Sequence, residues 1–86
     1  AYDLGRLDEA VEHLRRVGEL DPGDARPHRL IGLIYKDLAQ DAAAEEAYRE
    51  SLRRAPPADV ERAVRAELAE VLARQGRYAD GLDVLG

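Results

Sequence analysis

The sequence predicts an all-α protein, an α-solenoid in which five helices form antiparallel hairpins. Apolar residues recur at helical spacing along nearly the whole chain, and no stretch sustains the alternation of a half-buried strand. Proline and glycine interrupt this pattern and leave only short connections between helices. A set of small and apolar residues also recurs after 34 positions, which a single helical period would not produce.

The first two predicted helices are separated by a turn at Asp21-Pro22-Gly23. The first helix carries an apolar stripe at helical spacing, made of Leu7, Ala10, Val11, Leu14 and Val17. Asp24 is placed to cap the second helix, and Pro27 is tolerated in its first turn because that N–H lacks an intrahelical partner. The second helix extends to about Ala39, with apolar positions at Leu30, Ile31, Ile34, Tyr35 and Leu38.

Three further helices are predicted from residues that typically begin a helix and residues that typically end one. Asp41 is the predicted cap of the third helix, which Pro56-Pro57 ends. Asp59 is the predicted cap of the fourth helix, which Gly76 ends, and a last short helix follows. The apolar positions are Ala44, Ala47, Tyr48 and Leu52 in the third, Val60, Val64, Leu68, Val71 and Leu72 in the fourth, and Tyr78, Leu82 and Leu85 in the fifth.

The internal repeat divides the chain into helix pairs. A shift of 34 residues places Ala10 on Ala44 and Pro22 on Pro56. Gly5-Arg6-Leu7 matches Gly76-Arg77-Tyr78 at an offset of 71, which is 34 plus 37, so the second connection holds three extra residues. We therefore expect residues 1–22 to be the second half of a repeat, 23–56 a full repeat, and 57–86 a nearly full one.

The middle unit resembles the tetratricopeptide repeat (TPR) family. It reads His28-x2-Ile31-Gly32-x2-Tyr35, then Ala44-x3-Tyr48, then Pro56, against the family pattern W-x2-L-G-x2-Y, A-x3-F, P. The departures are His28 and Arg65 in place of tryptophan, Ser51 in place of a small apolar residue, and Ala39 in place of the turn glycine. The resemblance covers about two and a half repeats, and we expect a segment of a longer array. It implies a right-handed superhelix whose first helices line a concave groove for a peptide or partner helix.

Small residues stand where two helix axes must approach closely. They are Gly32 and Ala69 on first helices, and Ala10, Ala44 and Gly81 on second helices. Larger neighbours then fill the space on either side of each contact. We expect Tyr35, Tyr48 and Tyr78 to be packing residues, since all three lie at core spacing.

Composition narrows the classes of function. The 18 acidic residues outnumber the 13 basic ones, and a net charge of −5 disfavours nucleic acid and anionic membrane surfaces. Cysteine, threonine and asparagine are absent and Ser51 is the only serine, so few short polar groups are available for catalysis. We predict no enzyme activity. No membrane span or signal-peptide pattern is present, and we take the cytoplasm as the default location.

Neither a metal site nor a cofactor is predicted. His13 and His28 lie on different helices, with no i,i+4 partner and no cysteine nearby. Ser51 has no base near it in sequence, so we expect it to pack beside Tyr48 and not to act as a nucleophile.

The candidate binding residues are those of the first helices that face away from the second helices. In the middle unit they are Arg26, Arg29, Leu33 and Lys36, which lie within roughly 80° of one another on the helix. In the third unit they are Ala63, Ala66, Glu70, Ala73 and Arg74. The cations predict a mildly electropositive half-groove for an acidic segment, although a solvated helix face gives the same pattern. The family's clamp for chaperone carboxylates is not reproduced, since Leu33, Ala63 and Glu67 replace its polar and cationic residues.

A non-catalytic scaffold that binds a protein or peptide is the leading hypothesis. A structural segment that self-associates or stacks on further repeats through its open ends is an alternative, and so is an accessory part of a larger enzyme. A helical-repeat RNA reader is disfavoured, because such readers use amide and hydroxyl side chains that this sequence almost lacks.

Overall fold

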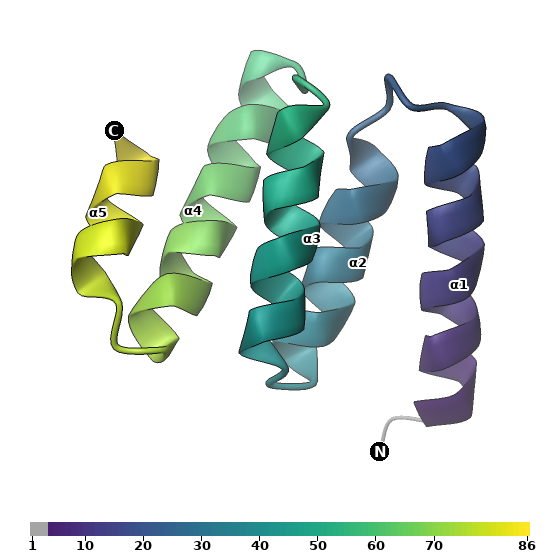
Figure 1. Cartoon of the computed structure of the whole chain (residues 1–86), viewed down its shortest axis with the longest axis horizontal. Helices are drawn as coiled ribbons and strands as arrows, with labels where there is room; N and C mark the ends of the chain where they lie inside the picture. Colours follow the sequence, from purple (N-terminus) through teal and green to yellow (C-terminus); the bar gives the residue numbers. More distant parts are fainter. Residues whose placement is uncertain (1–3) are drawn as a thin grey trace.

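The computed structural model describes residues 4–86, and that range contains five α-helices and no strand. The helices are α1 (Leu4–Leu20), α2 (Arg26–Asp37), α3 (Asp41–Arg53), α4 (Ala58–Arg74) and α5 (Tyr78–Leu85). Figure 1 shows them antiparallel to their chain neighbours, from α1 at one end to α5 at the other. The predicted all-α class and the five helices are confirmed.

The helices form two layers, with α2 and α4 in one and α1, α3 and α5 in the other (Figure 1). Each helix packs on the next along the chain, and α2 also contacts α4. Within residues 4–86, no Cα atom of α1 lies within 8 Å of one in α3, and none of α3 lies within 8 Å of one in α5. The helix backbones therefore approach each other more closely in the α2–α4 layer than in the other layer. We call this side the inner face and the side of α1, α3 and α5 the outer face.

The core depends on a close approach between α2 and α3. Tyr48 on α3 is fully buried, and its ring lies so close to Gly32 on α2 that a Cβ there would be 2.7 Å from Cε1. The main core cluster joins α3 to α4 and consists of Ala44, Tyr48, Val64, Leu68, Val71 and Leu72. A smaller cluster joins α1 to the middle hairpin and consists of Val11, Ile31 and Ala47. The predicted small residues therefore stand at helix contacts, with Gly81 also held against the carbonyl of Ala69.

The predicted helix caps are only partly correct. The Oδ1 of Asp24 accepts the backbone N–H of Arg26, the first residue of α2, at 3.0 Å, although the N-cap position itself is occupied by Ala25. Asp41 is instead the first residue of α3, and its carboxylate forms an ion pair with Arg74 of α4. Asp59 lies in the first turn of α4, which begins at Ala58 after Pro57. An aspartate in the first turn still stabilises a helix, because its negative charge lies near the positive end of the helix dipole. Aspartate near a helix start therefore indicates the start even where it is not the cap.

The helix ends require left-handed backbone at three turns. Gly76 has a φ of +77° and ends α4 as predicted. Ala39 and Ala55 have φ values of +59° and +50°, in the region that favours glycine. Ala39 stands in place of the turn glycine of the repeat pattern, so the turn geometry persists although its residue has changed.

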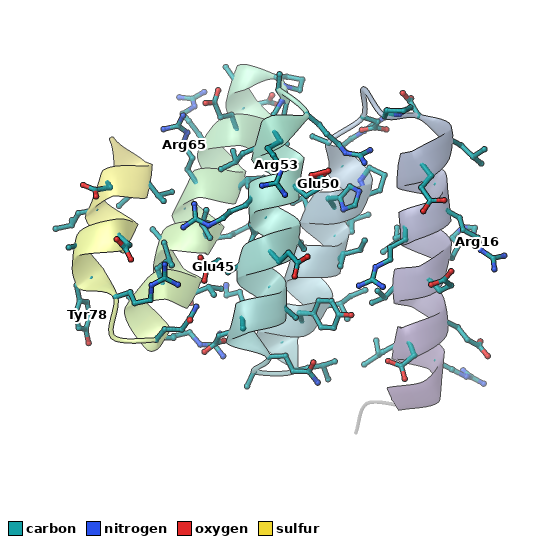
Figure 2. All side chains as sticks on the ribbon, viewed as in Figure 1. Arg16, Glu45, Glu50, Arg53, Arg65 and Tyr78 are labelled. Carbon is teal, nitrogen blue, oxygen red and sulfur yellow. The ribbon has the colours of Figure 1, made fainter. Side chains whose placement is uncertain are left out.

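Two sequence expectations are wrong. Tyr78 is not a packing residue, because 68% of it is exposed and it points away from α4 (Figure 2). The sequence match between Gly5 and Gly76 does not extend to the backbone, since Gly5 lies inside α1 and Gly76 lies in a turn. Both cases have the same cause. The repeat pattern reflects only the spacing of residues along the chain, whereas packing depends on which helices lie next to each residue in space.

Polar side chains connect neighbouring helices by donating hydrogen bonds to main-chain carbonyls. Ser51 is buried and donates to the carbonyl of Ala25 at 2.8 Å, which is a structural role and fits the expectation that it is no nucleophile. Arg54 donates to the carbonyl of Gly18, near the end of α1, at 2.6 Å. Arg65 is one of two residues in a tryptophan position, and its guanidinium donates to the carbonyl of Val84. Carbonyls in the last turn of a helix lack intrahelical donors, so arginines stabilise these ends.

We predict that Gly32→Ala destabilises the protein by about 1–3 kcal/mol, although alanine favours helices, because the new Cβ would overlap the Tyr48 ring. For a domain of this size that lowers the thermal midpoint by roughly 4–8 °C per kcal/mol. Gly23→Ala is the control, since its nearest contact would be 3.6 Å away. Equal midpoints for the two variants would contradict the packing described here.

Candidate functional site

The predicted binding residues lie on the inner face, on α2 and α4. They are Arg26, Arg29, Leu33 and Lys36 on α2, and Ala63, Ala66, Glu70, Ala73 and Arg74 on α4. Their surfaces range from half-buried for Leu33, Ala63 and Ala73 to exposed for Ala66 and Glu70. Because α2 and α4 contact each other, the two sets of residues form one continuous surface.

Each of the four cations in this set is held by a carboxylate. Arg26 pairs with Asp24 through two hydrogen bonds of 2.9 Å, which lower the pKa of Asp24 to about 2. Arg29 pairs with Glu67 through bonds of 3.2 and 2.8 Å. The remaining pairs are Lys36 with Glu70 and Arg74 with Asp41. The positive charge of the inner face is therefore matched by negative charge from the protein itself.

Three of these partners, Asp24, Glu67 and Asp41, were not among the predicted site residues. Glu67 lies 38 residues after Arg29, one position beyond the repeat offset of 37. The residue equivalent to Arg29 at that offset is Ala66, so the repeat pattern by itself points to the neighbour of Glu67 and not to Glu67. Asp41 gave no such signal, because it was expected to cap its own helix.

Between the ion pairs the inner face carries small and apolar side chains. Ala63, Ala66 and Ala73 present only methyl groups on the α4 side, and Leu33 lies on the α2 side. No described side chain projects here as a nucleophile. This surface can make van der Waals contact with a bulky group and hydrogen bonds along its charged edges.

The hydroxyl of Tyr48 is a buried polar group beneath the inner face. Its side chain is fully buried, and the hydroxyl has no hydrogen-bond partner within the described range. Burial raises the pKa of this hydroxyl well above its usual range, so it stays protonated. The charged groups that act on it all belong to α2 and α4: Glu67, Arg29, Asp37 and Glu70. The Tyr48 ring thus lies in the core against Gly32 of α2 and the apolar residues of α4.

A concave region lies on the outer face, between α1 and α3. It is a cleft of about 510 Å³ with Ile31, Tyr35, Ala43 and Ala47 among its apolar residues. Charged and polar residues line it as well: Arg15, His28, Glu46, Glu50 and Arg53. Figure 2 shows Glu50 and Arg53 on the exposed side of α3, where they form an ion pair. This cleft was not predicted from the sequence, because its walls come from different helix pairs.

His28 is a half-buried titratable residue of this cleft. It stands at a tryptophan position of the repeat and packs against Gly18 of α1, and its buried Nε2 has no hydrogen-bond partner among the described residues. Burial lowers the pKa of His28, and the positive charge of Arg54 lowers it further, while Glu50 opposes them weakly. The imidazole therefore resists protonation in the folded protein.

Over residues 4–86, no group of three or more histidine or acidic side chains is arranged to hold a metal ion. The same range has no helix that is both long and apolar enough to cross a membrane.

Comparison with known families identifies the repeat. A sequence model described as TPR repeat matches residues 1–38, and one described as tetratricopeptide repeat matches residues 29–57. Together they cover α1, α2, α3 and the turn that follows. No curated protein is significantly similar to the chain.

We predict that His28 makes the stability of the protein depend on pH. The pKa of His28 is lower in the folded state than its ordinary 6.5, so the unfolded chain binds a proton more readily. The contribution is fully present above pH 6.5 and is lost as the pH falls through the folded-state pKa.

The measurement is the free energy of unfolding in urea between pH 8 and 5, for the natural protein and His28→Gln. The variant should show the shallower pH dependence, and His13→Gln, at an exposed position, is the control. Identical slopes for the natural protein and His28→Gln would refute this role of His28.

Proposed function

Because the chain belongs to the tetratricopeptide repeat family, we propose that its inner face binds a peptide or a helix of a partner protein. The family generally mediates protein–protein interaction and is typically non-catalytic. The proposal is thus a scaffold that recognises its partner along α2 and α4, without chemistry of its own.

The observation that carries this proposal is the row of small side chains on the α4 side of the inner face, which we call the alanine floor. Ala63, Ala66 and Ala73 leave room beside Leu33, where longer side chains would cover the face. A strip of small side chains with charged edges fits a segment that presents one or two bulky apolar groups. Apolar anchors at the centre of a contact supply most of its affinity, and rim charges set its register.

The partner segment we propose is acidic. Arg29, Lys36 and Arg74 are held by carboxylates of the protein itself, and each pair is partly open to solvent. Exposed ion pairs contribute only about 0–1 kcal/mol each. Acidic groups of a partner can therefore replace the internal carboxylates at a small cost in free energy. In the complex, the cations would then pair with the partner's carboxylates instead of the protein's own.

We predict that Ala66→Trp blocks partner binding, because a large side chain would fill the floor of the inner face. Peptides selected from a random phage-displayed library on the natural protein would be measured by fluorescence polarisation. The expected loss of affinity for Ala66→Trp is tenfold or more. Ala42→Trp is the matched control, since Ala42 is also an exposed alanine but lies on α3.

Helical content and thermal midpoint of both variants should equal those of the natural protein. Equal affinity of both variants for the selected peptides would place the binding site elsewhere and contradict the proposal.

A second candidate function is self-association or stacking on further repeats through the two ends of the helix stack. At one end, Tyr78, Leu82 and Leu85 on α5 are 68%, 69% and 57% exposed. At the other end, Val17 and Leu20 on α1 and Leu30 on α2 are exposed as well. Large exposed apolar groups that gather on one helix face are typical of a contact surface.

We predict that Leu82→Glu abolishes any concentration-dependent association of the protein. Light scattering over a dilution series would measure the mass of the natural protein and of the variant. Asp83→Asn, beside it on α5, is the control that changes charge and leaves the apolar face intact. A mass that stays monomeric for all three proteins would exclude this second function for these 86 residues by themselves.

A further inference from the structure

The two grooves of the outer face differ in how they are bridged. The groove between α3 and α5 has a volume of about 290 Å³, and Arg77 spans it by donating to Glu45 of α3 at 2.6 Å and to Asp80 of α5 at 2.9 Å. The cleft between α1 and α3 is larger, at about 510 Å³. At the repeat offsets of 37 and 34, Arg77 and Glu45 correspond to Gln40 and Val11, which cannot form an ion pair. The bridge of the smaller groove therefore has no counterpart in the cleft.

Arg15, on the α1 wall of the cleft, has no carboxylate to pair with. In α3, Glu45 pairs with Arg49 one turn later at 3.0 Å. The equivalent residues of α1 are Val11 and Arg15, so valine stands where the carboxylate would be. Arg15 is exposed, and its side chain forms no ion pair or hydrogen bond with another residue in the range 4–86. Its guanidinium is available to a carboxylate from another molecule.

Glu46, on the α3 wall, is unpaired for a corresponding reason. In α1, Glu12 pairs with Arg16 one turn later at 3.5 Å. The equivalent residues of α3 are Glu46 and Glu50, so a second carboxylate replaces the cation, and Glu50 itself pairs with Arg53. Glu46 is exposed and has no ion pair within the part of the chain that the structure describes. The cleft therefore has an unpaired positive charge on its α1 wall and an unpaired negative charge on its α3 wall.

The floor between these two charges is apolar. It is lined by Ile31 and Tyr35 of α2 and by Ala43 and Ala47 of α3. Ile31 and Ala47 are buried, whereas Tyr35 and Ala43 are half-buried and offer apolar surface to a visitor. A volume of about 510 Å³ lies within the roughly 300–1,000 Å³ of typical binding pockets, so the cleft has room for bulky side chains.

We propose that this cleft binds an amphipathic helix of a partner protein. The apolar ridge of the helix lies on the floor, an acidic side chain on one flank pairs with Arg15, and a basic side chain on the other flank pairs with Glu46. The site lies on the outer face, so this inference goes beyond the proposed function and does not depend on it.

The walls of the cleft favour a helix over an extended segment. Both walls are helices, whose main-chain groups are hydrogen-bonded within each helix, so they offer no edge to which a strand can add. A helix satisfies its own main-chain groups, and its ridge of side chains fits a groove between two other helices. Opposite charges on the two walls then set the direction in which it lies, because each flank has one matching wall.

The test selects helices against the cleft. The full 86-residue protein is presented to a phage-displayed helical scaffold in which one exposed helix face is randomised. Affinities of the selected binders are measured by fluorescence polarisation. We expect binders with an apolar ridge between opposite charges, whose affinity falls about tenfold in Ala43→Trp and is unchanged in Ala66→Trp. Ala42→Trp is the matched control, since Ala42 is an exposed alanine of the same helix that does not line the cleft.

Exchange of the charges tests the two walls separately. Arg15→Glu should weaken these binders about threefold or more, and lysine in place of the binder's acidic flank should restore the affinity. A structural role of Arg15 would not produce this rescue. Glu46→Arg should likewise be rescued by glutamate on the binder's basic flank. Arg16→Glu is the control, because it makes the same change of charge on α1 outside the cleft.

A library that yields no binder, or only binders that Ala66→Trp blocks, would overturn the proposal. Failure of both charge exchanges to restore affinity would do the same. So would cleft binders from a linear peptide library that circular dichroism shows to be extended when bound.

A second copy of the chain is the remaining occupant to exclude. If light scattering shows that the natural protein dimerises on concentration and Ala43→Trp stays monomeric, the second copy fills the cleft and the partner helix is wrong. If Ala43→Trp loses its helical signal, the exchanges at Arg15 and Glu46 decide, because both residues are exposed. Peptide binding at the inner face can succeed or fail without changing any of these results.

Discussion

The contact of the Tyr48 ring with Gly32 is the constraint on which the rest of the structure depends. With no side chain on Gly32, α2 and α3 approach closely enough for the ring to cross between them and reach α4. The ring thereby joins the helix hairpin to the next repeat unit. Interiors pack densely, so a contact this short fixes the positions of both helices.

The same contact links the core to the inner face. Because the ring reaches through the helix layer, its hydroxyl lies under the surface formed by α2 and α4, where the Arg29–Glu67 pair is held. A residue that fills the core therefore also packs against both helices that carry the candidate site. Repeat proteins join each unit mainly to its neighbours, so a binding surface built from two adjacent first helices inherits the geometry of the contacts beneath it.

Much of the fold could be predicted because helices leave a periodic record in the sequence. The five helices, the turn at Gly76 and the small residues Gly32 and Ala44 all follow from spacing. Cap assignments were weaker, since Asp41 forms an ion pair with another helix and does not cap its own. The candidate site could be predicted only as a set of positions. Their ion pairing required knowing which residue of α4 lies opposite each residue of α2.

By itself the sequence determined the helix pattern, the length of the repeat and the family, because each of these is a property of residue order. The packed helices were needed to show that Glu67 neutralises Arg29, that the buried Tyr48 hydroxyl has no partner within residues 4–86, and that Tyr78 is exposed. These features depend on which side chains of different repeats come to face each other. That choice is made by packing, through angles and separations between helices that residue spacing does not encode.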